Sequence, residues 1–176
     1  MAFEQVLPRR LARWVAADPD WEQVYAEQLP RVLNFFRYRL GSTAEVEDLT
    51  ARTFEKAWRA RHRYRRDLGG FATWLLTIAR NVAIDHLRAR RRYEPLDAAA
   101  VVPSVDDTPE RQAVQQSEAQ RLATLLATLP PRERELMAMK YGADMTNRAI
   151  ARATGLSESN VGTILHRAVE SLRVRW

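Results

Sequence analysis

Apolar residues recur at every third or fourth position along most of this chain, and no stretch alternates convincingly at every second position. The first spacing is typical of amphipathic α-helices, and the second would indicate β-strands. Helical patterns run over residues 21–40, from residue 45 onward, over residues 71–90 and over residues 146–176. The pattern therefore predicts an all-α protein.

The C-terminal pattern predicts a short helix over residues 146–153, a turn over residues 154–156 and a second helix from Ser157. Ser157 is a good N-cap because its hydroxyl can accept an unpaired backbone N–H. One face of the second helix is apolar: Val161, Ile164, Leu165, Ala168 and Leu172. The other face is polar: Ser159, Thr163, His166, Arg167 and Glu170. The pattern fits a helix-turn-helix, whose second helix enters the DNA major groove, or an ordinary helical hairpin.

The helix expected after Gly41 has a capping box, Ser42 to Glu45, at its start. Its inward face is apolar or small: Val46, Leu49, Thr50, Thr53, Phe54 and Ala57. Charged residues on the other face form the pairs Asp48–Arg52 and Glu55–Arg59, each four positions apart. On the residues alone, this is a solvated face with weak ion pairs.

An arginine cluster, Arg59 to Arg66, follows and ends in a loop over residues 67–70. So dense a positive cluster repels itself unless an anion is near. The rings of Tyr64 and Phe71 could stack on unpaired bases. An exposed, solvated loop explains the same residues equally well.

The helix over residues 71–90 is apolar on two sides, which predicts packing between other helices. A narrow polar stripe separates these sides: Thr77, Asn81, Asp85 and Arg88. Asparagine is a poor helix former, so Asn81 indicates a hydrogen bond either to a base or to a neighbouring loop. The arginines that end this helix, from Arg88 to Arg92, suit phosphates.

The chain carries a net charge of +6, and 26 of its 28 basic residues are arginines. Arginine suits bidentate contact with phosphate or guanine, although codon bias or adaptation to heat would also explain it. Residues 93–117 are acidic, contain three prolines and lack apolar periodicity, which indicates a linker. We therefore expect two small helical domains, 21–92 and 118–176, joined by this acidic linker and preceded by an extension over residues 1–20.

Several classes of protein are not indicated by the sequence. There is no cysteine, and the three histidines lack metal-ligand spacing, so no metal is expected. No catalytic constellation or phosphate loop can be identified, so we expect neither an enzyme nor a cofactor. No segment predicts membrane insertion, and a cytoplasmic protein is expected. The basic amphipathic extension could pack on its own domain or lie on a membrane surface.

Three stretches together resemble a bacterial RNA polymerase sigma factor of the extracytoplasmic-function (ECF) type, in the sigma-70 family. Glu47-Asp48-Leu49 with Phe54 and Trp58 is similar to the helix that binds core polymerase. The run from Phe71 to Arg88 is similar to the helix that binds and melts the minus-ten element. The run from Leu129 to Leu136, leading into the helix-turn-helix, is similar to the minus-thirty-five-binding domain.

The resemblance implies three sites. The polymerase site, which would dock on clamp helices, comprises Glu47, Asp48, Arg52 and Glu55. The minus-ten site, with Asn81 in the pocket for a flipped base, comprises Arg63, Tyr64, Arg65, Thr77, Asn81, Asp85, Arg88 and Arg91. The minus-thirty-five site comprises Ser157, Ser159, Asn160, Thr163, His166 and Arg167. The implied partners are core RNA polymerase, duplex and melted promoter DNA, and an anti-sigma factor, with the linker threading the polymerase cleft.

This chain departs from the family pattern at three positions. Ala51 replaces the usual glutamine, while Gly162 and Ile164 stand where members often carry basic residues. Minus-thirty-five contacts are therefore expected to be weaker or differently specific. A stand-alone helix-turn-helix regulator, with an N-terminal helical domain for sensing or dimerisation, is the alternative function.

Overall fold

The computed structural model describes residues 21–41, 44–93 and 111–176, and every regular element in these ranges is helical. The predicted all-α class is confirmed. The amphipathic extension over residues 1–20 and most of the acidic linker lie outside the described residues. Among the described helices, none has the length and apolar character needed to cross a membrane.

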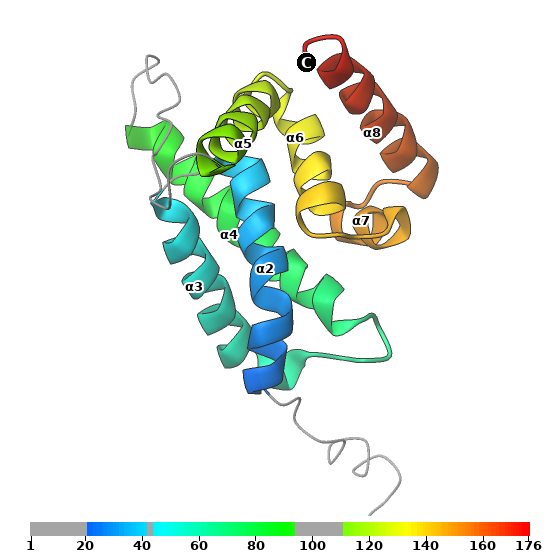
Figure 1. The fold of residues 1–176 in the computed structure, drawn as a ribbon. Coiled ribbons are helices and arrows are strands. Elements are labelled where there is room, and N and C mark those ends of the chain that lie inside the picture. Colours follow the sequence, from blue (N-terminus) through cyan, green and yellow to red (C-terminus); the bar gives the residue numbers. More distant parts are fainter. Residues whose placement is uncertain (1–20, 42–43, 94–110) are drawn as a thin grey trace, which may run out of the picture.

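The N-terminal bundle consists of α2 (Trp21–Leu40), α3 (Glu45–Arg59) and α4 (Phe71–Tyr93). Each of the three helices packs against the other two, and α2 lies between the rest of its bundle and the C-terminal helices (Figure 1). Residues on both apolar sides of α4, such as Leu75 and Leu76, are buried, as the double-sided pattern predicts. The inward face of α3 is also buried as expected, and its two threonine hydroxyls donate to backbone carbonyls one turn earlier.

The start of α3 differs from the expected capping box. The helix begins at Glu45 with Ala44 as its N-cap, and no side chain caps it. The carboxylate of Glu45 instead faces α4, where its Oε2 lies 3.3 Å from His86 Nε2 and 3.9 Å from Arg90. Ser42, the other half of the expected capping box, lies outside the described residues, and the Glu45 carboxylate lies at the basic end of α4.

The C-terminal bundle consists of α5 (Arg111–Ala127), α6 (Pro131–Met137), a π-helical turn η2 (Ala138–Gly142), α7 (Asn147–Thr154) and α8 (Glu158–Arg173). Helix α5 begins inside the segment expected to be linker, so helix extends further toward the N-terminus than the apolar pattern indicated. Leu126, Leu129 and Leu136 form part of the core that joins α5 and α6 to the other helices.

The helix-turn-helix forms as the sequence predicts. Thr146 caps α7 by accepting the Ala149 N–H at 3.2 Å, and Ser157 caps α8 by accepting the Asn160 N–H at 3.2 Å. Gly155 ends α7 with φ of 74°, a left-handed conformation in which a side chain would be strained. The buried residues Val161, Leu165 and Ala168 turn one face of α8 inward, and its polar face is left in solvent.

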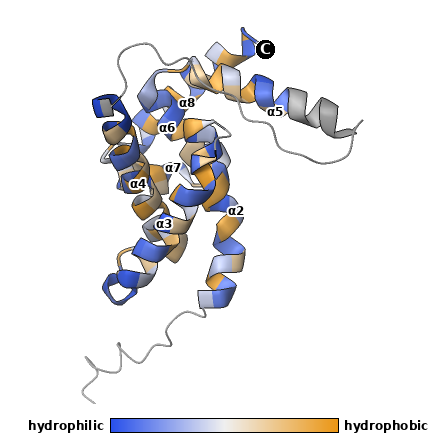
Figure 2. Cartoon of the chain, turned by 90° about the vertical axis from the view of Figure 1, so that its left-hand side faces the viewer, coloured by the Kyte–Doolittle hydropathy of each residue, from blue (hydrophilic) through white to orange (hydrophobic). Residues whose placement is uncertain are grey.

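The two bundles pack directly against each other. Helix α2 contacts η2, α5 and α6 of the C-terminal bundle, and α4 contacts α7 (Figure 1). Hydrophilic segments lie at both ends of α4 (Figure 2): the segment 60–70 before it, which we call the arginine-rich loop, and its last turn. The contact between the bundles therefore leaves the most basic segments of the N-terminal bundle at its surface.

Candidate nucleic-acid and polymerase interfaces

The outer face of α3 carries an exposed row of charges. Arg52 lies 3.8 Å from Asp48, with side chains 51% and 69% exposed, and Arg59 lies 2.6 Å from Glu55. These are the two pairs that the helical spacing predicts, and Glu47 is exposed beside them. Exposed ion pairs contribute little to stability, so this face can change partners at small cost.

Aromatic side chains border the charged face of α3. Trp58 and Tyr25 are each 47% exposed, and the Arg61 guanidinium stacks over the Trp58 ring at 4.1 Å. Trp21 packs edge-on against Trp58, with ring centroids 5.2 Å apart. Exposed aromatic and arginine side chains of this kind are enriched in protein interfaces.

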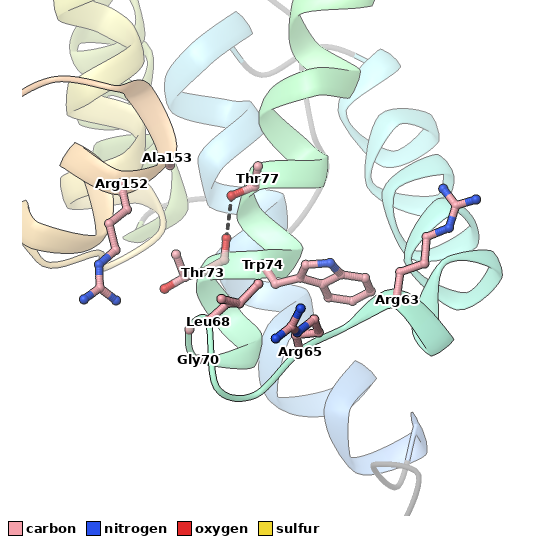
Figure 3. A pocket seen from close by; sticks show the side chains of 10 residues that line it. Arg63, Arg65, Leu68, Gly70, Thr73, Trp74, Thr77, Arg152 and Ala153 are labelled. Carbon is pink, nitrogen blue, oxygen red and sulfur yellow. Dashed lines mark hydrogen bonds between the residues drawn. The ribbon is translucent and has the colours of Figure 1, made fainter. Parts of the chain in front are cut away.

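A cavity of about 230 Å³ opens between the arginine-rich loop and the first turns of α4 (Figure 3). From the N-terminal bundle, the cavity is lined by Arg63, Arg65, Leu68, Gly69, Gly70, Thr73, Trp74 and Thr77. Two further lining residues, Arg152 and Ala153, come from α7. A tryptophan ring flanked by arginines and glycine backbone suits a base and its phosphates.

The aromatic rings at this loop are arranged differently from the stacking that the sequence suggested. Tyr64 packs against Phe71 and Trp74, with centroids 5.3 Å and 5.4 Å away, and its hydroxyl donates to the Gly69 carbonyl at 3.2 Å. Tyr64 therefore holds the loop in shape, whereas Trp74 lines the cavity. In the sequence, Trp74 belongs to one apolar side of the helix over residues 71–90, and nothing in its spacing separates a cavity wall from a core position.

The polar stripe on α4 runs away from this cavity along the helix. Thr77 is half-buried at the cavity and donates to the Thr73 carbonyl at 2.8 Å. Asp85 lies 3.8 Å from the Lys56 ammonium of α3, and Arg88 and Arg91 are exposed. Asn81 is exposed, does not line the cavity and makes no hydrogen bond to the described residues. The proposed structural bond to a neighbouring loop is thus absent from the described part of the chain.

Arginines near the cavity differ in what they contact. Arg65 binds Asp67 with both Nε and Nη2, at 3.3 Å and 2.7 Å, and this hydrogen bonding raises the pKa of Arg65. The Arg63 side chain makes no hydrogen bond or ion pair with the described residues, and it is exposed. Arg63 is therefore the freer of the two to bind an anion.

All residues of the expected minus-thirty-five site, on the polar face of α8 and at its N-cap, are exposed: Ser157, Ser159, Asn160, Thr163, His166 and Arg167. A groove of about 270 Å³ lies beside this face and is lined by His166 and Gly162 together with Lys140, Tyr141 and Arg173. Lys140 and Arg173 were not among the expected DNA contacts. The fold brings Lys140 of η2 beside α8, whereas Arg173 belongs to α8 itself and donates to Glu170 Oε1 at 2.8 Å.

Gly162 occupies an interior position of α8, where a glycine has no steric role. A Cβ built there would lie 3.7 Å from Asn147 Nδ2, an ordinary contact. Because glycine in a helix interior costs about 1 kcal/mol relative to alanine, Gly162→Ala should raise the free energy of unfolding by about that amount. Urea denaturation would measure it. Gly155→Ala is the matched control and should lower stability, since its φ of 74° disfavours a side chain. Equal effects at the two glycines would contradict this description of α8.

Family comparisons agree with this arrangement. The family Sigma-70 region 2 matches residues 24–93, which span the N-terminal bundle, and Sigma-70, region 4 matches residues 119–172, which span most of the C-terminal bundle. Within the part of the chain that the structure describes, no group of three potential metal ligands occurs.

Curated relatives point the same way. The chain is 30% identical to ECF RNA polymerase sigma factor SigL of Mycobacterium tuberculosis, over 94% of each chain. It is 29% identical to ECF RNA polymerase sigma factor RpoE of Cereibacter sphaeroides, over 86% of this chain and 83% of RpoE. It is 27% identical to BldN of Streptomyces coelicolor over 85% of this chain, but spans only 58% of BldN.

Solved structures show the same fold. CnrH, in complex with the cytosolic domain of CnrY, superposes with a TM-score of 0.69 at 23% identity over 94% of each chain. RpoE of Bartonella quintana, in complex with the anti-sigma factor NepR, gives 0.70 at 21% identity over 88% of this chain and 94% of RpoE.

The chain therefore belongs to the sigma-70 family. Within that family it is a sigma factor of the ECF type, a class that directs RNA polymerase to promoters. The stand-alone regulator is not favoured.

Proposed function

We propose that this sigma factor binds core RNA polymerase through the charged outer face of α3 and holds the melted minus-ten strand on α4 and the loop before it. Helix α8 reads the minus-thirty-five element. The observation that carries the proposal is the continuity of two features on α4. The arginine- and tryptophan-lined cavity leads along the helix to Asn81, which is exposed and has no hydrogen-bond partner among the described residues.

The chemistry of these groups suits promoter melting without catalysis. Flipping a base out of the duplex costs a few kcal/mol, which stacking and hydrogen bonds in a pocket can return. Trp74 supplies a ring for stacking, Asn81 supplies an amide that both donates and accepts, and Arg63 supplies charge for the backbone. The protein thereby stabilises a single strand, and bond-making is left to the polymerase.

Run-off transcription tests this function. The protein alone should bind duplex DNA weakly, and with core polymerase it should initiate at specific promoters. Tight, sequence-specific binding by the free protein, with no transcription when core enzyme is added, would restore the stand-alone regulator.

Further partners follow from the same proposal. CnrH and the Bartonella RpoE were each solved with a regulatory partner, and we propose that an anti-sigma factor also holds this chain. The acidic segment 93–117 would thread the polymerase cleft toward the RNA exit path. We also propose that the protein acts in the cytoplasm as a non-enzymatic subunit of the polymerase.

Charge reversal on α3 should weaken polymerase binding. Asp48→Arg replaces an exposed carboxylate opposite the buried Val46 and Leu49, so the fold should persist. Affinity for core polymerase should fall by about 1–3 kcal/mol if the carboxylate is desolvated in the interface. Titration with fluorescent core enzyme measures the loss. Glu118→Arg, the same charge change at an exposed position of α5, serves as the control and should bind like wild type. Equal binding by both variants would show that the charged face of α3 does not contact the polymerase.

The first turns of α8 should read sequence. Asn160 and Thr163 are exposed near its N-terminus, where base edges are normally contacted. Replacing either with alanine should change the preferred minus-thirty-five sequence, by about 1–3 kcal/mol where a bidentate contact is lost. Arg167→Ala, further along the same face, should instead weaken all sequences alike and reduce the salt dependence by about one phosphate contact. Selection from a promoter library distinguishes the two results, and an unchanged preference in the Asn160 and Thr163 variants would mean that α8 lies elsewhere on the DNA.

A further inference from the structure

Five aromatic rings form a continuous row through the N-terminal bundle. Trp21 of α2 packs edge-on against Trp58 of α3 and against Phe71 of α4, with ring centroids 5.2 Å and 5.7 Å apart. Phe71 and Tyr64 each lie close to Trp74, with centroids 5.3 Å and 5.4 Å away, and to each other at 5.3 Å. These five side chains, which we call the ring row, join three helices and the arginine-rich loop.

The two ends of the ring row lie at different candidate sites. Trp58 is 47% exposed and borders the charged face of α3, which is the proposed polymerase contact. Trp74 lines the cavity proposed for a single strand, together with arginines of the loop (Figure 3). Chains of packed side chains can carry energetic coupling between two sites. The ring row therefore provides a physical connection between the polymerase face and the cavity.

The arginine-rich loop is held at both ends by the ring row. Near its start, the Arg61 guanidinium lies 4.1 Å over the Trp58 ring, and its Nη1 donates to the Trp58 carbonyl at 2.9 Å. Near its end, the Tyr64 hydroxyl donates to the Gly69 carbonyl at 3.2 Å, and the loop leads into Phe71, the first residue of α4. A shift of Trp58 therefore moves the start of the loop, and a shift of Phe71 moves its end. Both movements change the wall of the cavity.

Trp21 occupies the centre of the ring row. Its ring contacts both Trp58 and Phe71, and no direct ring contact joins those two within the part of the chain that the structure describes. The indole Nε1 is buried and has no hydrogen-bond acceptor among the described residues. A buried donor without an acceptor costs free energy, so this side chain is not optimised for stability alone. Trp21 does not line the cavity and belongs to none of the three sites expected from the sequence.

We infer that Trp21 is a positioning residue: polymerase that covers Trp58 acts through the ring row to fix the arginine-rich loop and to preorganise the single-strand cavity. The inference rests on the proposed function, because it needs polymerase on α3 and a strand in the cavity. Covering the exposed side of Trp58 restrains its ring and the Arg61 stack beside it. A site that is fixed before its ligand arrives loses less freedom on binding. The holoenzyme therefore binds the melted strand more tightly than an uncoupled cavity would.

A label in the loop tests the coupling without promoter DNA. The chain contains no cysteine, so Leu68→Cys, at a position that is 67% exposed, accepts a nitroxide label selectively. The electron paramagnetic resonance spectrum then reports loop mobility in the full chain, free and bound to core polymerase. Core polymerase should immobilise the label in the otherwise wild-type protein and should leave it mobile in Trp21→Leu. Trp21→Phe retains a ring between the two neighbours and should restore the immobilisation.

Without the label, the same substitution should change promoter melting and not polymerase affinity. Trp21→Leu should bind core polymerase within about twofold of wild type, but the permanganate reactivity of minus-ten thymines should fall on the order of tenfold, within the range for coupled sites. The matched control is Tyr38→Leu, which also replaces a partly buried aromatic residue of α2 but lies outside the ring row. This control should melt promoters and immobilise the loop label as wild type does.

Arg61→Ala keeps the test decisive if Trp21→Leu folds poorly, because it removes the stack on Trp58 without altering the core of the bundle. Its loop label should also stay mobile on core polymerase. Equal immobilisation of the label in wild type, Trp21→Leu and Arg61→Ala, or wild-type melting by Trp21→Leu, would overturn the inference. A label whose mobility core polymerase leaves unchanged in the wild type would overturn it as well. Failure of run-off transcription by the wild type, with the label behaving as expected, would overturn the sigma-factor mechanism and not the ring row.

Discussion

Asn81→Ala is expected to leave closed promoter complexes intact and to reduce the melted fraction roughly 10- to 100-fold. Hydrogen bonds to a flipped base return about 1–3 kcal/mol, and each 1.4 kcal/mol corresponds to a factor of ten. The fold should not suffer, because the Asn81 side chain is exposed and has no hydrogen-bond partner in the described residues. Alanine should even stabilise α4 by about 0.5 kcal/mol, since asparagine is a poor helix former.

Permanganate reactivity of minus-ten thymines measures melting, and gel retardation with heparin-free samples measures closed-complex binding. Gln120→Ala, an exposed amide in α5 changed in the same way, is the matched control. It should melt promoters as wild type does. Wild-type permanganate reactivity in Asn81→Ala, or a large loss of thermal stability, would remove Asn81 from the single-strand site.

Helical periodicity predicted most of the fold because each helix presents a locally readable apolar stripe. The limits of α2 and the cap of α8 coincide with those expected, since Gly41 and Ser157 are strong local signals. The first helix of the helix-turn-helix begins one residue later than expected, because Thr146 caps it. The start of α5 does not coincide, because Arg111 lies in the segment 93–117, which lacks the apolar periodicity that predicts a helix. Helix ends could therefore be predicted where a strong local signal marks them, and not where the apolar pattern is absent.

The candidate sites also differ in how far local sequence signals could predict them. The exposed charge pairs of α3 and the polar face of α8 could be predicted, because both follow from position on a single helix. The cavity beside Trp74 could not, because its wall combines a loop, α4 and α7. The Arg80–Glu135 pair and the close approach of Gly142 to the backbone of α2 join residues far apart in the chain, and nothing in the sequence distinguishes these residues from other arginines, glutamates and glycines.

Removing two free arginines from the minus-ten surface should weaken promoter binding broadly. Arg63→Ala with Arg88→Ala deletes two exposed guanidinium groups that have no ion-pair partner among the described residues. If each binds one phosphate at about 1 kcal/mol, holoenzyme affinity should fall about 30-fold. The slope of log affinity against log salt should decrease by about 1.5, because single strands release about 0.7 and duplexes about 0.9 counterions per contact.

The control must have the same net charge, because any loss of two positive charges weakens long-range attraction to DNA. Arg37→Ala with Arg132→Ala meets this condition, since both side chains are exposed and lie outside the candidate sites. Its affinity should fall only slightly and its salt slope should stay near that of wild type. A salt titration of promoter binding separates the cases. Equal slopes for the two double variants would show that Arg63 and Arg88 act only through net charge and do not contact phosphates, and the minus-ten surface would then have to lie on another face of α4.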